Sequence, residues 1–133
     1  MPNYARLPVT FSRGDGAWLY DNTNKRYLDA ISGIAVCSLG HSHPAITAAI
    51  CEQANTLLHT SNLYGIEAQN RLADALTKHS GMDTAFFANS GAEANETAIK
   101  MARLWGDKNG IKNPAIIVME NSFHGRTLAT LSA

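Results

Sequence analysis

The stretch Phe87–Glu96, which reads FANSGAEANE, decides the fold of this 133-residue chain. It follows the apolar run Thr84–Ala88 and leads into a helical pattern over Glu93–Trp105. A turn from a buried strand directly into a helix is therefore predicted. Ser90 and Glu93 have the spacing of a capping box, in which each side chain accepts one of the N–H groups left free at the start of a helix.

The start of that helix is a candidate phosphate site. The free N–H groups near Gly91 and Ala92 point off the end of the helix, where the helix dipole is positive. Small residues are needed there because a bulky side chain would keep an anion away from the backbone. A plain capped helix explains the same spacing equally well, and the stretch is neither G-x-G-x-x-G nor a Walker loop ending in Lys. Both interpretations stay open on spacing alone.

A second polar loop, Glu120–Thr127, follows the next apolar run, Ala115–Met119. In parallel α/β sheets, ligands bind outside the carboxyl ends of the strands, so two such loops on neighbouring strands would meet at one site. Phe123 would then offer a ring face, and Arg126 a planar fork suited to a carboxylate. The alternative is that the Phe completes the core and the Arg lies in solvent.

The remaining elements predict an α/β protein with two parts. Gly, Asn and Asp turns separate three β-prone runs, which predict an antiparallel meander over Val9–Ser12, Ala17–Asp21 and Arg26–Ala30. Helical spacing and helix-end residues predict two helices, over 44–58 after Pro44 and from about Glu67 to 79 with Gly81 as the C-terminal cap. Near-continuous apolar strands alternating with helices after that point predict a buried parallel sheet. The composition changes near residue 64, which predicts a boundary between 1–64 and 65–133.

The overall composition limits the classes of partner. Apolar residues make up 45% and charged residues 17% of the chain, as in folded globular proteins. Eleven basic residues balance eleven acidic ones, so we expect no binding to nucleic acid or to a membrane. The first twenty residues have no apolar core of a signal peptide, which predicts a cytoplasmic protein. The last residues, Thr127–Ala133, contain no helix stop, and we expect a truncated chain.

The two polar loops together resemble those of the acetylornithine type of class III, fold-type I pyridoxal-phosphate-dependent aminotransferases. The resemblance extends over Val9–Ala133, and the stretches that carry it are Asn89–Ala98, Ser122–Thr127, Gly40–Pro44 and Gly16–Asp21. It implies a truncated α/β fold: a small antiparallel meander, followed by the first strands and helices of a large parallel-sheet domain. Residues 1–64 would be the N-terminal segment of the small domain with its first long helix. Residues 65–133 would be the incomplete start of the large domain that binds pyridoxal phosphate (PLP).

The resemblance implies a cofactor site in the second part of the chain. The backbone of Gly91 and Ala92, together with Ser90, would bind the phosphate of PLP. Phe123 would stack on its pyridine ring, and His124 would line the pocket.

Three further residues match substrate-binding positions of the family. Arg126 corresponds to the arginine that holds the α-carboxylate of the substrate. Ile34 aligns with a position that tends to be tyrosine in ornithine aminotransferases, where it helps to hold a free α-amino group. An aliphatic residue there fits a substrate whose α-nitrogen is acylated. Tyr64 lies in a segment that approaches the substrate entrance in relatives, although a loop tyrosine more often serves packing.

Other parts of the family's chemistry have no candidate in this chain. They are the lysine that binds PLP covalently, the aspartate that pairs with the pyridine nitrogen, and a phosphate-binding threonine from the second subunit of a homodimer with shared active sites. The five lysines stand in turn, helix or loop contexts that do not match: Lys25, Lys78, Lys100, Lys108 and Lys112. We therefore expect no catalytic residue here. His41 and His43 lack further metal ligands nearby, so no metal is expected and helix-entry hydrogen bonding is the simpler interpretation.

The function implied is transfer of the terminal amino group of N2-acetylornithine to 2-oxoglutarate. The partners implied are small-molecule amino acid and 2-oxo acid substrates and the second subunit of the homodimer. The rival substrates within the class are succinylornithine, ornithine, succinyldiaminopimelate and 4-aminobutyrate. A non-catalytic fragment that only dimerises or binds phosphate is an alternative of another kind. A nucleotide-binding α/β module is disfavoured by the missing second and third glycines.

Overall fold

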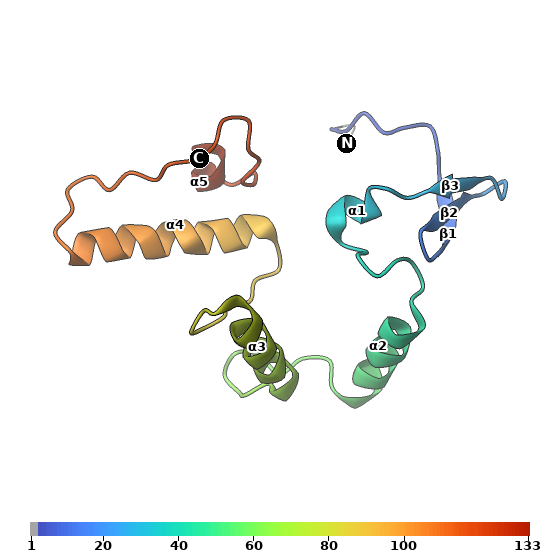
Figure 1. Cartoon of the computed structure of the whole chain (residues 1–133), viewed down its shortest axis with the longest axis horizontal. Helices are drawn as coiled ribbons and strands as arrows, with labels where there is room; N and C mark the ends of the chain where they lie inside the picture. Colours follow the sequence, from blue (N-terminus) through green and yellow to red (C-terminus); the bar gives the residue numbers. More distant parts are fainter. Residues whose placement is uncertain (1–2) are drawn as a thin grey trace. The chain divides into compact units, whose positions relative to one another are not determined.

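A three-stranded antiparallel sheet, in the order β1-β2-β3, opens the described part of the chain, residues 3–133 of the computed structural model (Figure 1). Its strands are β1 (Phe11–Asp15), β2 (Trp18–Asp21) and β3 (Arg26–Leu28). The tight turn between β1 and β2 contains Gly16, whose φ of 53° suits a glycine. The predicted meander is confirmed, with β1 lying slightly later in the sequence than expected.

A buried carboxylate organises the turn between β2 and β3. Oδ1 of Asp21 accepts the N–H of Thr23 at 2.8 Å, its hydroxyl at 2.7 Å, and the N–H of Lys25 at 3.0 Å. The hydroxyl of Tyr27 donates to Oδ2 at 3.0 Å. These bonds, led by that of the Thr23 hydroxyl, lower the pKa of Asp21 because they favour the charged form, against the opposing effect of burial.

A turn of left-handed backbone follows the sheet and was not predicted. It is α1 (Ser32–Ala35), in which the four φ angles lie between 51° and 62°. Successive left-handed residues are rare because the Cβ approaches the next carbonyl oxygen, and a β-branched residue such as Ile34 is the least suited to them. Asp29 supports the turn by accepting the N–H groups of Ile31 and Ser32 at 3.1 and 2.8 Å.

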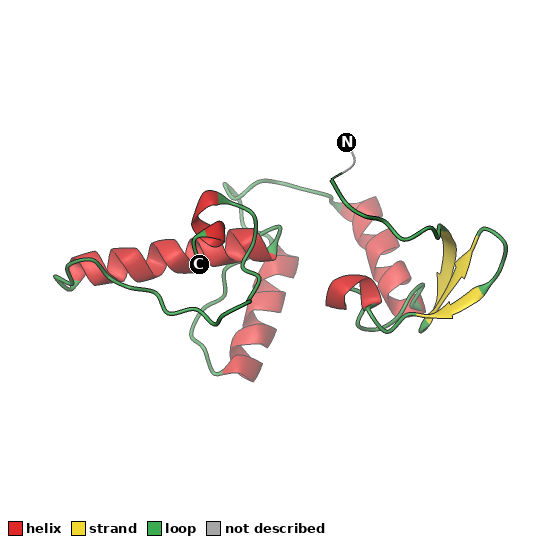
Figure 2. Cartoon of the chain, turned by 90° about the horizontal axis from the view of Figure 1, so that it is seen from above, coloured by secondary structure: helices red, strands yellow, loops and turns green. Residues whose placement is uncertain are grey.

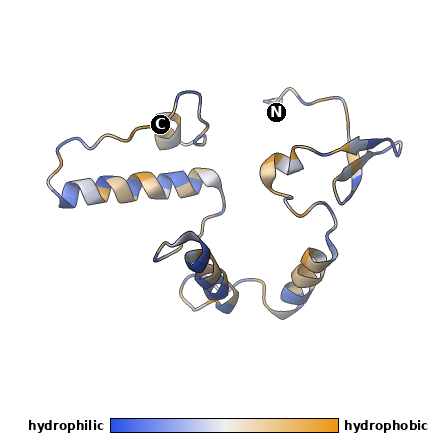
Figure 3. Cartoon of the chain, in the orientation of Figure 1, coloured by the Kyte–Doolittle hydropathy of each residue, from blue (hydrophilic) through white to orange (hydrophobic). Residues whose placement is uncertain are grey.

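The long helices begin and end close to the predicted residues. They are α2 (Pro44–Thr56), α3 (Glu67–Ser80) and α4 (Gly91–Lys108). Pro44 stands in the first turn of α2, where its missing N–H costs nothing. Gly81 ends α3 with a φ of 72°, as expected for a C-terminal cap. Figure 3 shows α2 mainly in hydrophobic colours, whereas α3 is more hydrophilic.

The segment after α4 returns along that helix and ends in the short α5 (Leu128–Leu131) (Figures 1 and 2). Gly106 of α4 is buried against Pro114, so that an added Cβ would lie 3.0 Å from the Cβ of the proline. Farther along, side chains of α4 hold residues 124 and 127 by hydrogen bonds. The return path is therefore fixed at both of its ends.

The two strands predicted at 84–88 and 115–119 are not formed within the described residues. Both segments are drawn as loop in Figure 2 and pair with no other strand. Parallel strands exist only through ladder hydrogen bonds to neighbours, and the two segments do not bond to each other. Their apolar side chains are correspondingly open to solvent, with Phe86 70% and Ile117 94% exposed. The prediction that they are buried is wrong for this structure.

The chain divides into two units, residues 1–64 and 65–133. The first contains the sheet, α1 and α2, and the second contains α3, α4 and α5. No apolar side chain is fully buried in either unit, as far as the structure describes them, and the most buried polar residues are Asp21 and Thr130. None of the helices described in residues 3–133 is both long and apolar enough to cross a membrane.

Candidate active site

The candidate site begins at the N-terminus of α4. Oγ of Ser90, the N-cap residue, accepts the N–H of Glu93 at 3.2 Å. The carboxylate of Glu93 reaches back, although its strongest partner is the N–H of Asn89 at 2.6 Å and not that of Ser90. Half of the predicted capping box is thus displaced by one residue, since Glu93 bonds to the residue before the cap. Within the described chain, the N–H groups of Gly91 and Ala92 make no hydrogen bond, which leaves two donors at the positive end of the helix.

The second predicted loop lies against this helix end. Gly125 is buried with a φ of 136°, and a Cβ added to it would lie 2.8 Å from the Cβ of Ala92 and 2.7 Å from the Oγ1 of Thr130. Only a glycine permits this approach of the loop to α4. The guanidinium of Arg126 lies 5.7 Å from the centre of the Phe123 ring, within the range of a cation–π contact.

Helix end and loop together line an open pocket of about 430 Å³, which we call the α4 pocket. Six of the eight predicted site residues lie in its wall: Ser90, Gly91, Ala92, Phe123, His124 and Arg126. Asn95 and Gly125 complete it. The convergence that the sequence predicted from two neighbouring strands therefore occurs, but through contacts between loop and helix instead of through a sheet.

The α4 pocket suits a planar anionic group. A Cβ added to Gly91 meets no atom within 4 Å, so there is room beside the two free amides. The Phe123 ring is 77% exposed and can be covered by another ring. The Nδ1 of His124 is buried and has no hydrogen-bond partner among the described residues, an arrangement that a bound polar group would relieve.

Asn95 and Glu96 of α4 hold the loop but were not predicted as site residues. The Asn95 amide donates to the backbone oxygen of His124 at 2.7 Å. The hydroxyl of Thr127 donates to the carboxylate of Glu96 at 2.5 Å. The carboxylate of Glu96 also lies 4.0 Å from the ammonium of Lys100, one helix turn later. Both loop contacts join residues about 30 positions apart, and no local sequence pattern indicates them.

The other two predicted substrate residues, Ile34 and Tyr64, belong to the first unit. Ile34 stands in the left-handed turn and is 86% exposed, and Tyr64 is 69% exposed. The structure does not connect either residue to the α4 pocket, so both remain predictions.

The histidines of the H-x-H motif differ in their contacts. Nε2 of His41 lies 2.7 Å from Oδ2 of Asp29, and this bond is the main cause of the lowered pKa of Asp29. His43 makes no side-chain hydrogen bond as the N-cap of α2, so the predicted helix-entry role is wrong for that residue. Among residues 3–133, no three His, Cys, Asp or Glu side chains cluster closely enough to hold a metal ion.

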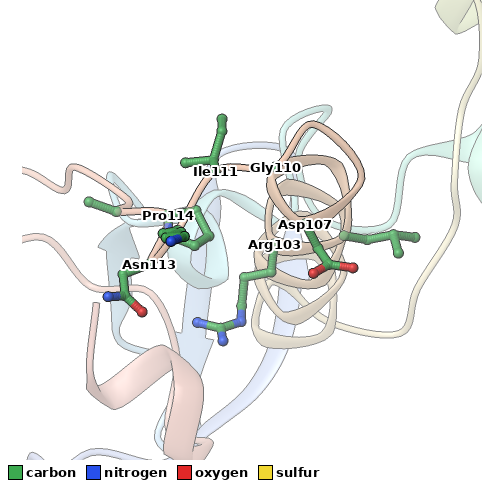
Figure 4. A pocket seen from close by; sticks show the side chains of 9 residues that line it. Arg103, Asp107, Gly110, Ile111, Asn113 and Pro114 are labelled. Atoms are coloured by element: carbon green, nitrogen blue, oxygen red, sulfur yellow. The ribbon is translucent and has the colours of Figure 1, made fainter.

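A second pocket, of about 1030 Å³, lies at the opposite end of α4 (Figure 4). Arg103 and Asp107 of the helix line it, together with Gly110, Asn113 and Pro114 of the turn that follows. Apart from half-buried Pro114, every residue of its wall is exposed, and none was predicted as a site residue. We regard it as the open concave side of the helix-to-loop turn.

Comparison with known proteins identifies the family. The model of the aminotransferase class-III family matches residues 1–133. The chain belongs to the class-III aminotransferases. It is 65% identical to the acetylornithine aminotransferase of Nitrosomonas europaea over all 133 residues, which is 34% of that relative.

Solved structures agree with this assignment. The N-acetylornithine aminotransferase of Stenotrophomonas maltophilia K279a matches 93% of this chain and 35% of its own, with a TM-score of 0.86 and 42% identity. The ornithine aminotransferase of Toxoplasma gondii ME49 matches the whole chain and 32% of its own, with a TM-score of 0.91 and 34% identity. The predicted fold class is thereby confirmed. The chain spans about a third of the length of these relatives.

Proposed function

We propose that this chain is part of a PLP-dependent transaminase that transfers the terminal amino group of N2-acetylornithine to 2-oxoglutarate. The observation that carries the proposal is the α4 pocket, in which two free helix amides, an exposed aromatic ring and an arginine face one space. The high identity to an acetylornithine aminotransferase supports the choice of substrate.

The residues of the pocket divide into a phosphate end and a ring end. The N–H groups of Gly91 and Ala92, beside the capped Ser90, would bind the phosphate through charge-assisted hydrogen bonds at the positive helix terminus. Phe123 would stack on the pyridine ring, and His124 would offer its buried Nδ1 to a polar group nearby. When bound, PLP accepts an electron pair from the carbon that carries the amino group, and this allows the group to move between two acids.

Arg126 would orient the substrate. Its planar guanidinium matches a carboxylate in two parallel hydrogen bonds, which fixes the direction of the α-carboxylate as well as its position. Its position 5.7 Å from the Phe123 ring centre keeps the carboxylate site near the cofactor ring. Ile34 and Tyr64 would contribute from the first unit, where an aliphatic Ile34 suits an acylated α-nitrogen.

We also propose the domain roles and the assembly. Residues 1–64 would belong to the small domain and residues 65–133 to the start of the large PLP-binding domain, and the division of the structure at the same boundary supports this. The lysine that binds PLP, the aspartate that pairs with its ring nitrogen, and a threonine from a second subunit would come from the length that the relatives have beyond this chain. The protein would be a cytoplasmic homodimer with shared active sites.

The substrate is tested by comparing five amino donors with the full-length protein and 2-oxoglutarate: acetylornithine, succinylornithine, ornithine, succinyldiaminopimelate and 4-aminobutyrate. We expect the highest kcat/KM with acetylornithine. A preference for ornithine would contradict the interpretation of Ile34, and similarity to the Toxoplasma gondii enzyme makes ornithine the second candidate.

The alternative of a non-catalytic fragment predicts a different result. We expect borohydride reduction of the loaded full-length protein to place the pyridoxyl label outside residues 1–133, and the 133-residue chain alone to be inactive. A label on any of the five lysines of this chain, found by peptide mapping, would contradict the proposal. Absence of transamination with all five donors would favour the non-catalytic alternative.

A further inference from the structure

Two hydrogen bonds fasten the loop of the α4 pocket to α4, one on each side of Gly125. The first joins the Asn95 amide to the carbonyl of His124, next to Phe123. The second joins the Thr127 hydroxyl, next to Arg126, to the Glu96 carboxylate. Consecutive helix residues project about 100° apart, so the side chains of Asn95 and Glu96 reach the loop in two different directions.

The Glu96 contact belongs to a directed chain of hydrogen bonds. A carboxylate only accepts, so the single hydroxyl proton of Thr127 points to Glu96. In the 2.8 Å contact between the two threonine hydroxyls, Thr130 is then the side that can donate, and the other acceptor near its proton, the backbone oxygen of Thr127, is farther away at 3.3 Å. The Oγ1 of Thr130 in turn accepts the N–H of Thr127 at 3.0 Å. The negative charge of Glu96 thus strengthens the capping box that begins α5, in which Thr130 is only 2% exposed.

We propose that Asn95 and Glu96 are positioning residues with separate tasks: Asn95 holds the half of the loop that carries Phe123, and Glu96 holds, through Thr127, the half that carries Arg126. Gly125 separates the halves and allows both to lie against the helix. Resting on the proposed function, the inference makes Asn95 important for PLP affinity and the Glu96–Thr127 pair important for substrate affinity. Neither side chain needs to touch PLP or substrate for this effect.

Hydrogen–deuterium exchange of the full-length protein without cofactor tests the fastening itself, independently of any activity. Asn95→Ala removes a neutral hydrogen bond and should speed exchange of the amides in 122–127 by about two- to tenfold. Thr127→Val removes a hydrogen bond to a charged carboxylate and should speed the same exchange by about tenfold or more. Two matched controls lose a bond from an amide or hydroxyl side chain to a backbone oxygen of α4, without touching the loop. Asn109→Ala removes a bond to the oxygen of Trp105, and Thr97→Val removes one to the oxygen of Glu93. Exchange in 122–127 that equals the wild type would overturn the inference.

The division of tasks is tested by two affinities. Asn95→Ala should weaken PLP binding to the cofactor-free protein, measured by fluorescence titration, more than it raises KM for the amino donor. Thr127→Val and Glu96→Gln should raise KM for the amino donor by about tenfold with a smaller change in PLP binding. Thr127→Ser keeps the hydroxyl and should have the KM of the wild type. Equal effects of all variants on both affinities would overturn the separate tasks. If the wild type transaminates none of the donors, the proposed function fails, whereas the exchange experiment still decides whether the loop is fastened.

Discussion

The meander (residues 11–28) and the α4–α5 corner (residues 89–131) both place a polar residue at their most buried point, but they build its surroundings differently. In the meander, the partners of Asp21 lie two to six positions away in sequence. In the corner, the buried Thr130 bonds to Thr127, three positions away, but Thr127 and the rest of the loop are held to α4 by contacts between residues about 30 positions apart. Closing a longer loop costs more chain entropy, so the corner depends on each contact more than the meander does.

This difference bears on function because the corner holds the candidate site. A loop fastened by a few long-range bonds can be displaced by a single substitution, whereas the turn around Asp21 re-forms locally. A substitution that displaces this loop should therefore have a larger effect than a matched substitution that leaves the loop in place.

The largest effect is expected from Gly125→Ala. The new Cβ would lie within 2.8 Å of both Ala92 and Thr130, and the φ of 136° is itself unfavourable for alanine. Strain and overpacking together should lower the free energy of unfolding by roughly 2 to 4 kcal/mol. The control Gly110→Ala has a φ of 70° but no atom within 4 Å of its added Cβ, and should cost only about 1 to 2 kcal/mol. If urea unfolding shows the same loss of unfolding free energy for Gly125→Ala and Gly110→Ala, packing of Gly125 against α4 is unimportant.

Arg126→Lys should weaken substrate far more than cofactor. Lysine cannot make the two parallel hydrogen bonds of a guanidinium, so a loss of about 1.5 to 3 kcal/mol is expected in the apparent affinity for acetylornithine. PLP binding, measured by titration, should change little. Arg103→Lys is a matched control because Arg103 belongs to α4 but lines the pocket at the opposite end of that helix (Figure 4). An unchanged substrate affinity in Arg126→Lys would assign this residue to structure.

Acid should weaken the meander and the turn that follows it through two carboxyls. Folding lowers the pKa of Asp21, mainly through the Thr23 hydroxyl, and that of Asp29, mainly through His41. Their stabilisation is therefore complete above the ordinary value of 3.8 and is lost as the pH falls below it. The fluorescence of Trp18, isolated by Trp105→Phe, should report this acid transition, and Asp21→Asn should flatten it. A transition that Asp21→Asn leaves unchanged would remove Asp21 as its cause.

Much of this arrangement follows from the sequence, because its causes are local. Turn residues predict the meander, Pro44 and Gly81 predict helix ends, and the Ser90 cap predicts the start of α4. The left-handed backbone at Ile34 was missed because propensity opposes it, and only contacts such as those of Asp29 support it. The strand predicted at 84–88 is the opposite case. Its apolar pattern is that of a strand in a parallel sheet, but these residues do not include the neighbouring strands with which it would pair.

The smallest predicted effect concerns Ser90, where local capping and ligand binding can be separated. Its Oγ accepts the N–H of Glu93 at 3.2 Å, and Ser90→Ala should cost about 1 kcal/mol of unfolding free energy without cofactor. Ser80 offers a matched control: its Oγ accepts the N–H of Met82 at the same 3.2 Å, but at the C-terminal end of α3. Because that end has no free N–H groups to cap, Ser80→Ala should cost less.

If Ser90 also binds the phosphate, as the family resemblance implies, Ser90→Ala should lower the free energy of unfolding more when PLP is bound than when it is absent. We expect the cost of Ser90→Ala to increase by about 1 kcal/mol on saturation with cofactor, the contribution of one hydrogen bond. Ser90→Thr keeps the hydroxyl and should behave as the wild type in both states. Thermal unfolding with and without PLP measures the difference. An equal cost in both states would restrict Ser90 to capping α4 and leave the phosphate to the amides of Gly91 and Ala92.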